Sequence, residues 1–315
     1  MGAESVNLAK SFVKDAEKAS KSSWLSKPQW DIAATNWDKA ANAFKTAMHY
    51  ESAVDCYVKA SEAYVKVNII FLAAKGFEEA ATLTEKHIND HAKAITYYTR
   101  ASDLYRSHGS SADRAAAVMV KAAEGCEYVD TDQSIQLYEN ALSIYESEDR
   151  NRFSIPTFKR LTAFLIKKNR LLEAAGVQVR LGKMCEQINS RPELSKSYLS
   201  AVILTLAFGD SVEAGKKLDE FAGNVTFVRS NEGTVANAMV EAYEGGDQEQ
   251  FGILAHDQTV SFLDSAISRL ALQIRVPGGK RAPQPSDNMA PGMSGAGAHG
   301  QPAYDAGVDE EEDLL

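Results

Sequence analysis

Residues 57–80 read YVKASEAYVKVNIIFLAAKGFEEA, and this stretch carries one pattern twice at a twenty-residue step: an aromatic residue followed three positions later by alanine. The first copy is Tyr57 with Ala60, and the second copy, twenty residues later, is Phe77 with Ala80. Recurrence at a fixed step of this length is typical of a stacked array of similar units. Working outward, the pattern recurs at Trp37/Ala40, Tyr98/Ala101 and Tyr138/Ala141, and in a weaker form at Met119/Ala122.

A twenty-residue step holds one helix of about four turns and a short connection. Two steps therefore make an antiparallel hairpin of about 40 residues. At each contact the aromatic side chain would fill a hole in the neighbouring helix, and the alanine one turn later would let the two backbones approach. The sequence predicts an all-α fold, a tetratricopeptide-like, right-handed solenoid of helical hairpins that forms a twisted sheet of antiparallel helices.

The periodicity divides the chain into three regions. Residues 1–190 are the predicted repeat array, interrupted by an apolar loop at residues 21–30. Residues 191–276 are less regular, although Asp210 and Glu213 have the spacing of a capping box at a helix start, and we expect a C-terminal helical bundle that caps the array. Five of the eight prolines fall in residues 277–315, which we expect to be a disordered linker with an acidic, leucine-terminated tail.

The net charge of −9 argues against a protein whose main task is to hold nucleic acid, because that task requires a dominant basic surface. The charge is unevenly spread. Residues 280–315 contain seven acids and two bases, so more than half of the excess negative charge lies there. The helical body is therefore only mildly acidic and can carry a basic face.

The chain has three cysteines, Cys56, Cys126 and Cys185, far apart at apolar helical positions. They predict reduced core thiols in a cytosolic protein rather than a disulfide framework. We expect no signal peptide, and the longest apolar stretch, residues 69–74, is far too short to span a bilayer.

Two short motifs are similar to known catalytic or binding motifs but lack residues that the chemistry needs. Residues 176–183 are similar to a phosphate-binding loop, but the glycine spacing is one residue too long and Met184 stands where Ser or Thr must hold magnesium. His87 and His91 are four apart, which would place them on one helical face, but Ile88 replaces the glutamate of the metalloprotease motif. We interpret the histidines as an exposed polar pair, and we predict no catalytic residue, no cofactor and no metal site.

A set of basic residues lies in the middle of the otherwise acidic array. Lysines usually occupy solvated helix faces, so an ordinary surface accounts for the set. The alternative is a concave, positively charged binding surface. The members are Lys121, Lys159, Arg160, Lys167, Lys168, Arg170 and Arg180.

The loop at residues 21–30 contains Trp24, Leu25 and Trp30 among polar residues. These side chains either fold back on the first helix pair or form an exposed apolar tip that rests on a membrane surface, where indoles favour the headgroup level.

The chain ends in five acids followed by two leucines. Such a run is most often a solubilising tail. The terminal leucines favour a second reading, a short docking motif that combines charge with an apolar anchor. The residues are Asp309, Glu310, Glu311, Glu312, Asp313, Leu314 and Leu315.

The array, the apolar loop after the first helix, the helical cap and the acidic tail together resemble the soluble NSF attachment proteins over nearly the whole chain. Within that family the chain is most similar to the gamma form, although the ending Asp313-Leu314-Leu315 is closer to the alpha form. The segments that carry the resemblance are Lys27-Pro28-x-Trp30-Asp31-x-Ala33-Ala34, Val240-Glu-Ala-Tyr243-Glu-Gly-Gly-Asp247-Gln-Glu-Gln250 and Val276-Pro277-Gly278-Gly279-Lys280-Arg281.

The resemblance implies an adaptor, not an enzyme. It implies that the chain binds four-helix SNARE complexes of the syntaxin type, recruits the hexameric NSF ATPase, and works in the cytoplasm, peripherally associated with endomembranes of the ER, the Golgi and vesicles. Lys121 and Arg160 would then stand where the family has SNARE-contacting basic residues, with Lys159, Lys167 and Arg170 beside them. Residues 309–314 would contact NSF, and Trp24, Leu25 and Trp30 the membrane.

Two other kinds of protein share the predicted architecture. A tetratricopeptide-type co-chaperone would need Lys, Asn and Arg at matched places in successive first helices, and the corresponding positions do not supply them. A membrane-coat or tethering scaffold without ATPase coupling is the stronger alternative, because it shares the solenoid and would not need the tail.

Overall fold

The structure of this chain is a computed structural model, which describes residues 2–22, 27–109 and 111–278. These residues are helical throughout and contain no strand. Residues 1–280 form one compact unit. The helices are α1 (Gly2–Ser20), α2 (Trp30–Thr46), α3 (Tyr50–Lys66), α4 (Ile70–Leu83), the π-helix η1 (Thr84–Ile88), α5 (His91–Ser107), α6 (Ala112–Cys126), α7 (Thr131–Ser147), α8 (Asn151–Lys167), α9 (Leu171–Gln187), α10 (Arg191–Phe208), α11 (Ser211–Phe221), α12 (Val225–Val228), α13 (Asn231–Glu244), α14 (Gln248–Ala255), α15 (Gln258–Ser261) and α16 (Ser265–Ala271).

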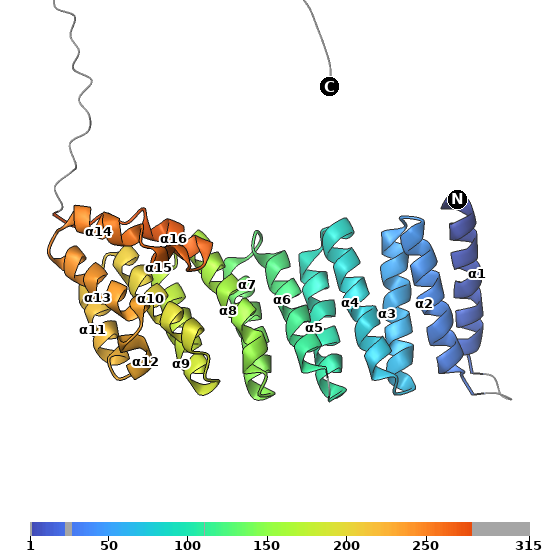
Figure 1. The fold of residues 1–315 in the computed structure, drawn as a ribbon. Coiled ribbons are helices and arrows are strands. Elements are labelled where there is room, and N and C mark those ends of the chain that lie inside the picture. The colour runs from blue at the N-terminus through green and yellow to red at the C-terminus, as the bar shows by residue number, and fades with distance from the viewer. Residues whose placement is uncertain (1, 23–26, 110, 279–315) are drawn as a thin grey trace, which may run out of the picture. The chain divides into compact units, whose positions relative to one another are not determined.

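Each helix from α1 to α10 packs mainly on the helices before and after it in the chain. Figure 1 shows them side by side in chain order, with alternating direction, from blue α1 to yellow α10. The predicted all-α array of helical hairpins is therefore confirmed.

Six of the joints between these helices share one backbone geometry. A residue with positive φ follows the helix end, and the next N–H donates to a carbonyl five residues back, as His49 N does to Phe44 O at 2.9 Å and Arg170 N to Leu165 O at 2.9 Å. This is the Schellman motif, which satisfies carbonyls that the helix end leaves without a partner. The residues with positive φ recur at the same step as the aromatic residues. They are Met48, Asn68, Asn89, Gly109, Asp149, Asn169, Asn189 and Gly209.

The aromatic–alanine pairs lie at the contacts between helices, as predicted. Tyr57, Phe77, Tyr98 and Tyr138 are each at most 2% exposed, and the paired alanines are buried with them. Burial of these rings and of the facing alanines supplies the apolar area that holds neighbouring helices together.

The repeat continues beyond Tyr138 and Ala141, the last copy named above. Phe158 of α8, Gln178 of α9 and Tyr198 of α10 are buried at successive twenty-residue steps. Gln178 is polar in an apolar position, and its Nε2 donates to Thr162 Oγ1 at 2.8 Å, which offsets the cost of burying the amide. The copies at Phe158 and Gln178 lack the pattern because leucine replaces the alanine three positions later, whereas Tyr198 with Ala201 carries it in full.

The helices after α10 are shorter and pack around its end. α10 contacts α11, α12, α13 and α16 as well as α9, and it is buried nearly all round. Asp210 Oδ1 accepts from Glu213 N at 2.8 Å, so the predicted cap forms. The Glu213 side chain completes no capping box; its carboxylate bonds Lys217 at 2.7 Å instead.

The interpretation of His87 and His91 as neighbours on one helical face is wrong. His87 lies in η1, Asn89 then adopts a left-handed conformation with φ 59°, and His91 begins α5. The His87 ring stacks on Tyr50 with centroids 3.8 Å apart, whereas His91 is half-buried. The described residues contain no group of three or more potential metal ligands.

Two sequence-based readings of local features, the helix at residues 176–183 and the buried cysteines, are confirmed. Residues 176–183 lie inside α9 and form no loop. Cys56, Cys126 and Cys185 are free and buried, and burial raises the pKa of each thiol to about 11. Among the described helices, none is long and apolar enough to cross a bilayer.

Two glycines of α9 allow the effect of packing on stability to be distinguished from that of helix propensity. A Cβ at Gly182 would overlap the Tyr198 ring, which is 3% exposed and stacked on Phe221 with centroids 3.9 Å apart, whereas a Cβ at Gly176 would meet nothing within 4 Å. We predict that Gly182→Ala lowers the free energy of unfolding by about 1–3 kcal/mol, because overpacking outweighs the propensity gain. Gly176→Ala, the matched control, should be neutral or stabilising by up to about 1 kcal/mol. Urea unfolding of both variants checks this, and equal stabilities would contradict the close approach of α9 and α10.

Candidate functional site

Ion pairs connect helices that are two apart in the chain, so the even-numbered and odd-numbered helices form separate rows. We name the surface of α2, α4, α6, α8 and α10 that bears these pairs the even row. Each pair joins a base of one helix to an acid of a neighbouring helix of the row. The pairs are Lys45–Glu79, Lys121–Glu78, Arg160–Glu124 and Lys159–Glu193.

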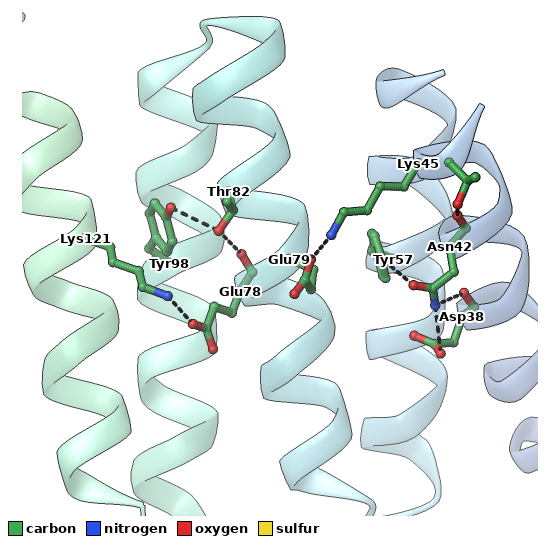
Figure 2. A network of polar contacts seen from close by, with 10 residues as sticks. Asp38, Asn42, Lys45, Tyr57, Glu78, Glu79, Thr82, Tyr98 and Lys121 are labelled. Atoms are coloured by element: carbon green, nitrogen blue, oxygen red, sulfur yellow. Dashed lines mark hydrogen bonds and ion pairs between the residues drawn. The ribbon is translucent and has the colours of Figure 1, made fainter. Parts of the chain in front are cut away.

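Glu78 and Glu79 are adjacent on α4 but point to opposite neighbours, as Figure 2 shows. Glu79 accepts from Lys45 of α2 at 2.7 Å, and Glu78 accepts from Lys121 of α6 at 2.6 Å. Two adjacent acids of α4 therefore form ion pairs with the even-row helices on either side of it, α2 and α6.

Glu78 is the more firmly held of the two acids. Its second carboxylate oxygen accepts from the hydroxyl of Tyr105 at 2.8 Å, and its side chain is only 14% exposed, against 48% for Lys121. The pKa of Tyr105 is raised, first by burial and then by this bond and the carboxylate charge. The carboxylate of Glu78 is thus fixed in place, and it holds the ammonium of Lys121 at the surface of the row.

A small polar cavity of about 170 Å³ lies between α2, α3 and α4 at the start of the even row. Its lining includes Asp38, Lys75 and the Lys45–Glu79 pair. Burial, and to a lesser extent Glu79, raises the pKa of Asp38, while Lys75 opposes the shift. Acids and bases are balanced around this cavity.

Lys121 and Arg160 occupy equivalent positions in the repeat. Each stands two residues after the buried position of its helix, Met119 in α6 and Phe158 in α8. The Arg160 guanidinium bonds Glu124 of α6, and both side chains are about half exposed. The structure therefore places these two predicted SNARE-binding cations in one line, each already bonded to an acid of the preceding even helix.

Lys159 precedes Arg160 but points the other way along the row. Its ammonium lies 3.0 Å from Glu193 of α10 and 3.4 Å from Asp264, the residue before α16. Burial lowers its pKa, but the two carboxylates outweigh burial, so the pKa is raised. Lys159 is therefore bonded towards the end of the array and Arg160 towards its beginning.

Lys167, Lys168 and Arg170 lie about two turns farther, where α8 ends. The Lys167 ammonium lies 4.4 Å from the ring centroid of Tyr128, which is 82% exposed, and Lys168 lies over Phe164. Arg170 bonds Asp132 and, at 2.5 Å, Glu173. These three cations form a group at the edge of the array, separate from Lys121 and Arg160.

Arg180 belongs to the other row. It bonds Glu139 at 2.5 Å and Glu146 at 2.6 Å, both on α7, just as Arg100 of α5 pairs with Glu62 of α3. The structure does not bring Arg180 together with Lys121 and Arg160.

Sequence reasoning missed the acids of the even row. A signal for them exists, because Glu78 and Glu124 precede Lys121 and Arg160 by 43 and 36 residues, about one hairpin, which puts opposite charges on neighbouring even helices. The cations of this row are consequently not an uncompensated basic patch; each has an acid at hydrogen-bond distance.

Of the three predicted membrane contacts, only Trp30 lies within the described residues. It begins α2, is half-buried against the core cluster that includes Ala16, Ala33 and Trp37, and its ring is covered by the ammonium of Lys66 at 3.5 Å. Trp24, Leu25 and the predicted NSF contacts at residues 309–314 lie outside the part of the chain that the structure describes.

Comparison with known proteins gives a consistent result. Residues 7–274 match the family described as soluble NSF attachment protein, SNAP. The gamma-soluble NSF attachment protein of Dictyostelium discoideum is 30% identical over 268 residues, which is 84% of this chain and 82% of the relative. The protein of the same name from Arabidopsis thaliana is 32% identical over 202 residues, 64% of this chain and 69% of the relative.

The matched range runs from α1 to the turn after α16 and so includes both the repeat array and the helices that follow it. On this range and these identities, the chain belongs to the soluble NSF attachment protein family.

Proposed function

We propose that this chain is an adaptor that binds SNARE complexes and recruits and stimulates the NSF ATPase for SNARE disassembly in vesicle fusion and membrane trafficking. The observation that carries the proposal is family membership over residues 7–274, supported by two relatives that are named as NSF attachment proteins. Proteins of this family are adaptors rather than enzymes.

The even row is the surface we assign to the SNARE bundle. A four-helix bundle is a rod, and a row that runs across five even-numbered helices offers it a long contact. Carboxylates of the bundle would share or take over the contacts that Lys121 and Arg160 make with Glu78 and Glu124. Lys167 and Arg170 would extend the contact towards the end of α8.

The remaining contacts belong to segments at the two ends of the chain. We assign the membrane surface to Trp24 and Leu25, with Trp30 at the base of the loop, and NSF to residues 309–314. In this arrangement the chain acts in the cytoplasm at the surface of endomembranes.

Co-sedimentation with a purified syntaxin-type SNARE bundle, with and without NSF, tests the proposal. An adaptor sediments with the bundle and brings NSF with it. A coat or tethering scaffold assembles without recruiting NSF, and that result would replace the proposal with the scaffold function.

The first prediction concerns the even row. Reversing Lys121 and Arg160 together to glutamate should weaken binding of the bundle on the order of tenfold at low ionic strength and flatten its salt dependence, because exposed charges act through a screened field. Binding is measured on an immobilised bundle at several salt concentrations.

The matched control reverses Arg100 and Arg180, which occupy the equivalent repeat positions in α5 and α9 and are also ion-paired, but in the odd row. This variant should lose similar ion pairs and keep its affinity for the bundle. Equal loss of affinity in both variants would remove the even row as the binding surface.

The second prediction concerns the loop. Trp24→Ser with Leu25→Ser should leave the melting temperature nearly unchanged and slow disassembly of membrane-anchored complexes more than that of soluble ones. Trp30→Ser should instead lower the free energy of unfolding by about 1–3 kcal/mol, because its indole is half-buried under Lys66. Thermal melts and disassembly assays with and without liposomes separate the two variants; equal rates on liposomes and in solution would count against a membrane contact.

The third prediction concerns the C-terminus. Leu314→Ala should spare binding of the bundle and most recruitment of NSF but reduce stimulated ATP hydrolysis and disassembly. Neutralising residues 309–313 should weaken recruitment itself, because the acids supply attraction to a basic surface and tethering raises their local concentration. If a chain ending at Val308 still supports disassembly at the normal rate, the acidic tail serves solubility alone.

A further inference from the structure

Lys159 makes contacts unlike those of the other even-row cations. It bonds two acids on two different elements, Glu193 in the first turn of α10 and Asp264 at the start of α16. Its side chain is one-third exposed, less than that of Lys121 or Arg160. The ammonium therefore sits where the array meets the terminal helices.

The missing capping bond of Asp264 independently supports the role of Lys159 at this junction. Asp90, Asp130, Asp210, Asp247 and Asp257 also stand at helix N-caps, and each accepts a hydrogen bond from a backbone N–H of the helix it begins. Asp264 is the N-cap of α16, yet its side chain makes no capping bond. Its carboxylate is turned to Lys159 instead. The contact with Lys159 therefore takes the place of a stabilising capping bond.

The contacts of α16 show what this ion pair holds in place. α16 packs on α10 and also on α8, whereas the main contacts of α11, α12 and α13 with the array are with α10. The chain then continues to Val276, whose N–H donates to Gln248 Oε1 of α14 at 2.8 Å. α16 is thus a second link between the terminal helices and the array, beside the contacts of α11, α12 and α13 with α10.

We propose that Lys159 is a positioning residue: it clamps α16 to α8 and α10 and so fixes α16, and with it the chain up to Val276, against the even row. In sequence it belongs to the cations expected to contact the SNARE bundle, but its ammonium is bonded to Glu193 and Asp264 of the same chain. The two adjacent cations of α8 therefore have different roles: Arg160 is available to the bundle, whereas Lys159 forms ion pairs within the protein. The link to ATPase stimulation rests on the proposed adaptor function; the clamp does not.

The neighbouring residue offers a matched test. Lys159→Met keeps the length of the aliphatic stem and removes the charge, and Arg160→Met does the same one position away. In the full-length chain, Lys159→Met should raise amide exchange rates of residues 264–276 about fivefold, as expected for local opening after loss of a partly exposed ion pair. Its affinity for an immobilised SNARE bundle should stay within about twofold, while stimulated NSF hydrolysis at saturating adaptor falls. Arg160→Met should show the reverse: normal exchange and weaker binding.

Asp264→Asn serves as a second variant, because asparagine is a good N-cap and preserves the start of α16. It should increase exchange in α16 as Lys159→Met does, and the double variant should exchange no faster than either single one, since all three lack the same bond. Unchanged exchange together with bundle binding as weak as in Arg160→Met would overturn the clamp and return Lys159 to the binding surface. Faster exchange with undiminished stimulation would overturn the coupling to NSF. If no variant and no wild-type chain binds the bundle, the adaptor function fails, and the exchange data still decide whether the clamp exists.

Discussion

The close approach of consecutive helices is the constraint on which the rest of this structure depends. Most helices of the array are narrow at one point, where alanine follows a buried ring, and Ala40, Ala60 and Ala80 are at most 1% exposed. At Gly182 the approach is closest, because the Tyr198 ring occupies the space that a Cβ would need. Only helices this close can bring side chains of the next-nearest helix within reach of one another, so the ion pairs of the even row depend on the same small residues.

The architecture could be predicted from sequence because it arises from local periodicity, and periodicity is visible in one chain. The aromatic residues, the alanines and the Asp caps repeat or obey short-range rules, and the structure confirms them. The extension of the repeat through Gln178 could not be seen in this way, because the amide is tolerated only through its bond to Thr162, sixteen residues earlier. The pairing of His87 and His91 was misjudged for a related reason: a single left-handed residue, Asn89, breaks the helix between them.

The ion-pair partners on neighbouring helices were the part of the candidate site that was hardest to predict from sequence. The sequence shows Lys121, Lys159 and Arg160 as a set of like charges, but not that Glu78, Glu124 and Glu193 lie beside them. An ion pair depends on which face of the helix a residue occupies and on which neighbour lies there, and both follow from packing rather than from spacing along the chain. The resulting row is nearly balanced in charge, so recognition of a partner would depend on exchange between carboxylates at short range more than on a net positive field.

Packing between neighbours alone also has a mechanical consequence. Since each helix from α1 to α10 rests mainly on the two beside it, the array is a set of compliant contacts in series, and its stiffness falls as helices are added. A load applied at one end is shared among the contacts, each of which yields slightly while its own core stays intact. An adaptor built in this way would follow the twist of a rod that is being unwound, and would keep its grip while the rod changes shape.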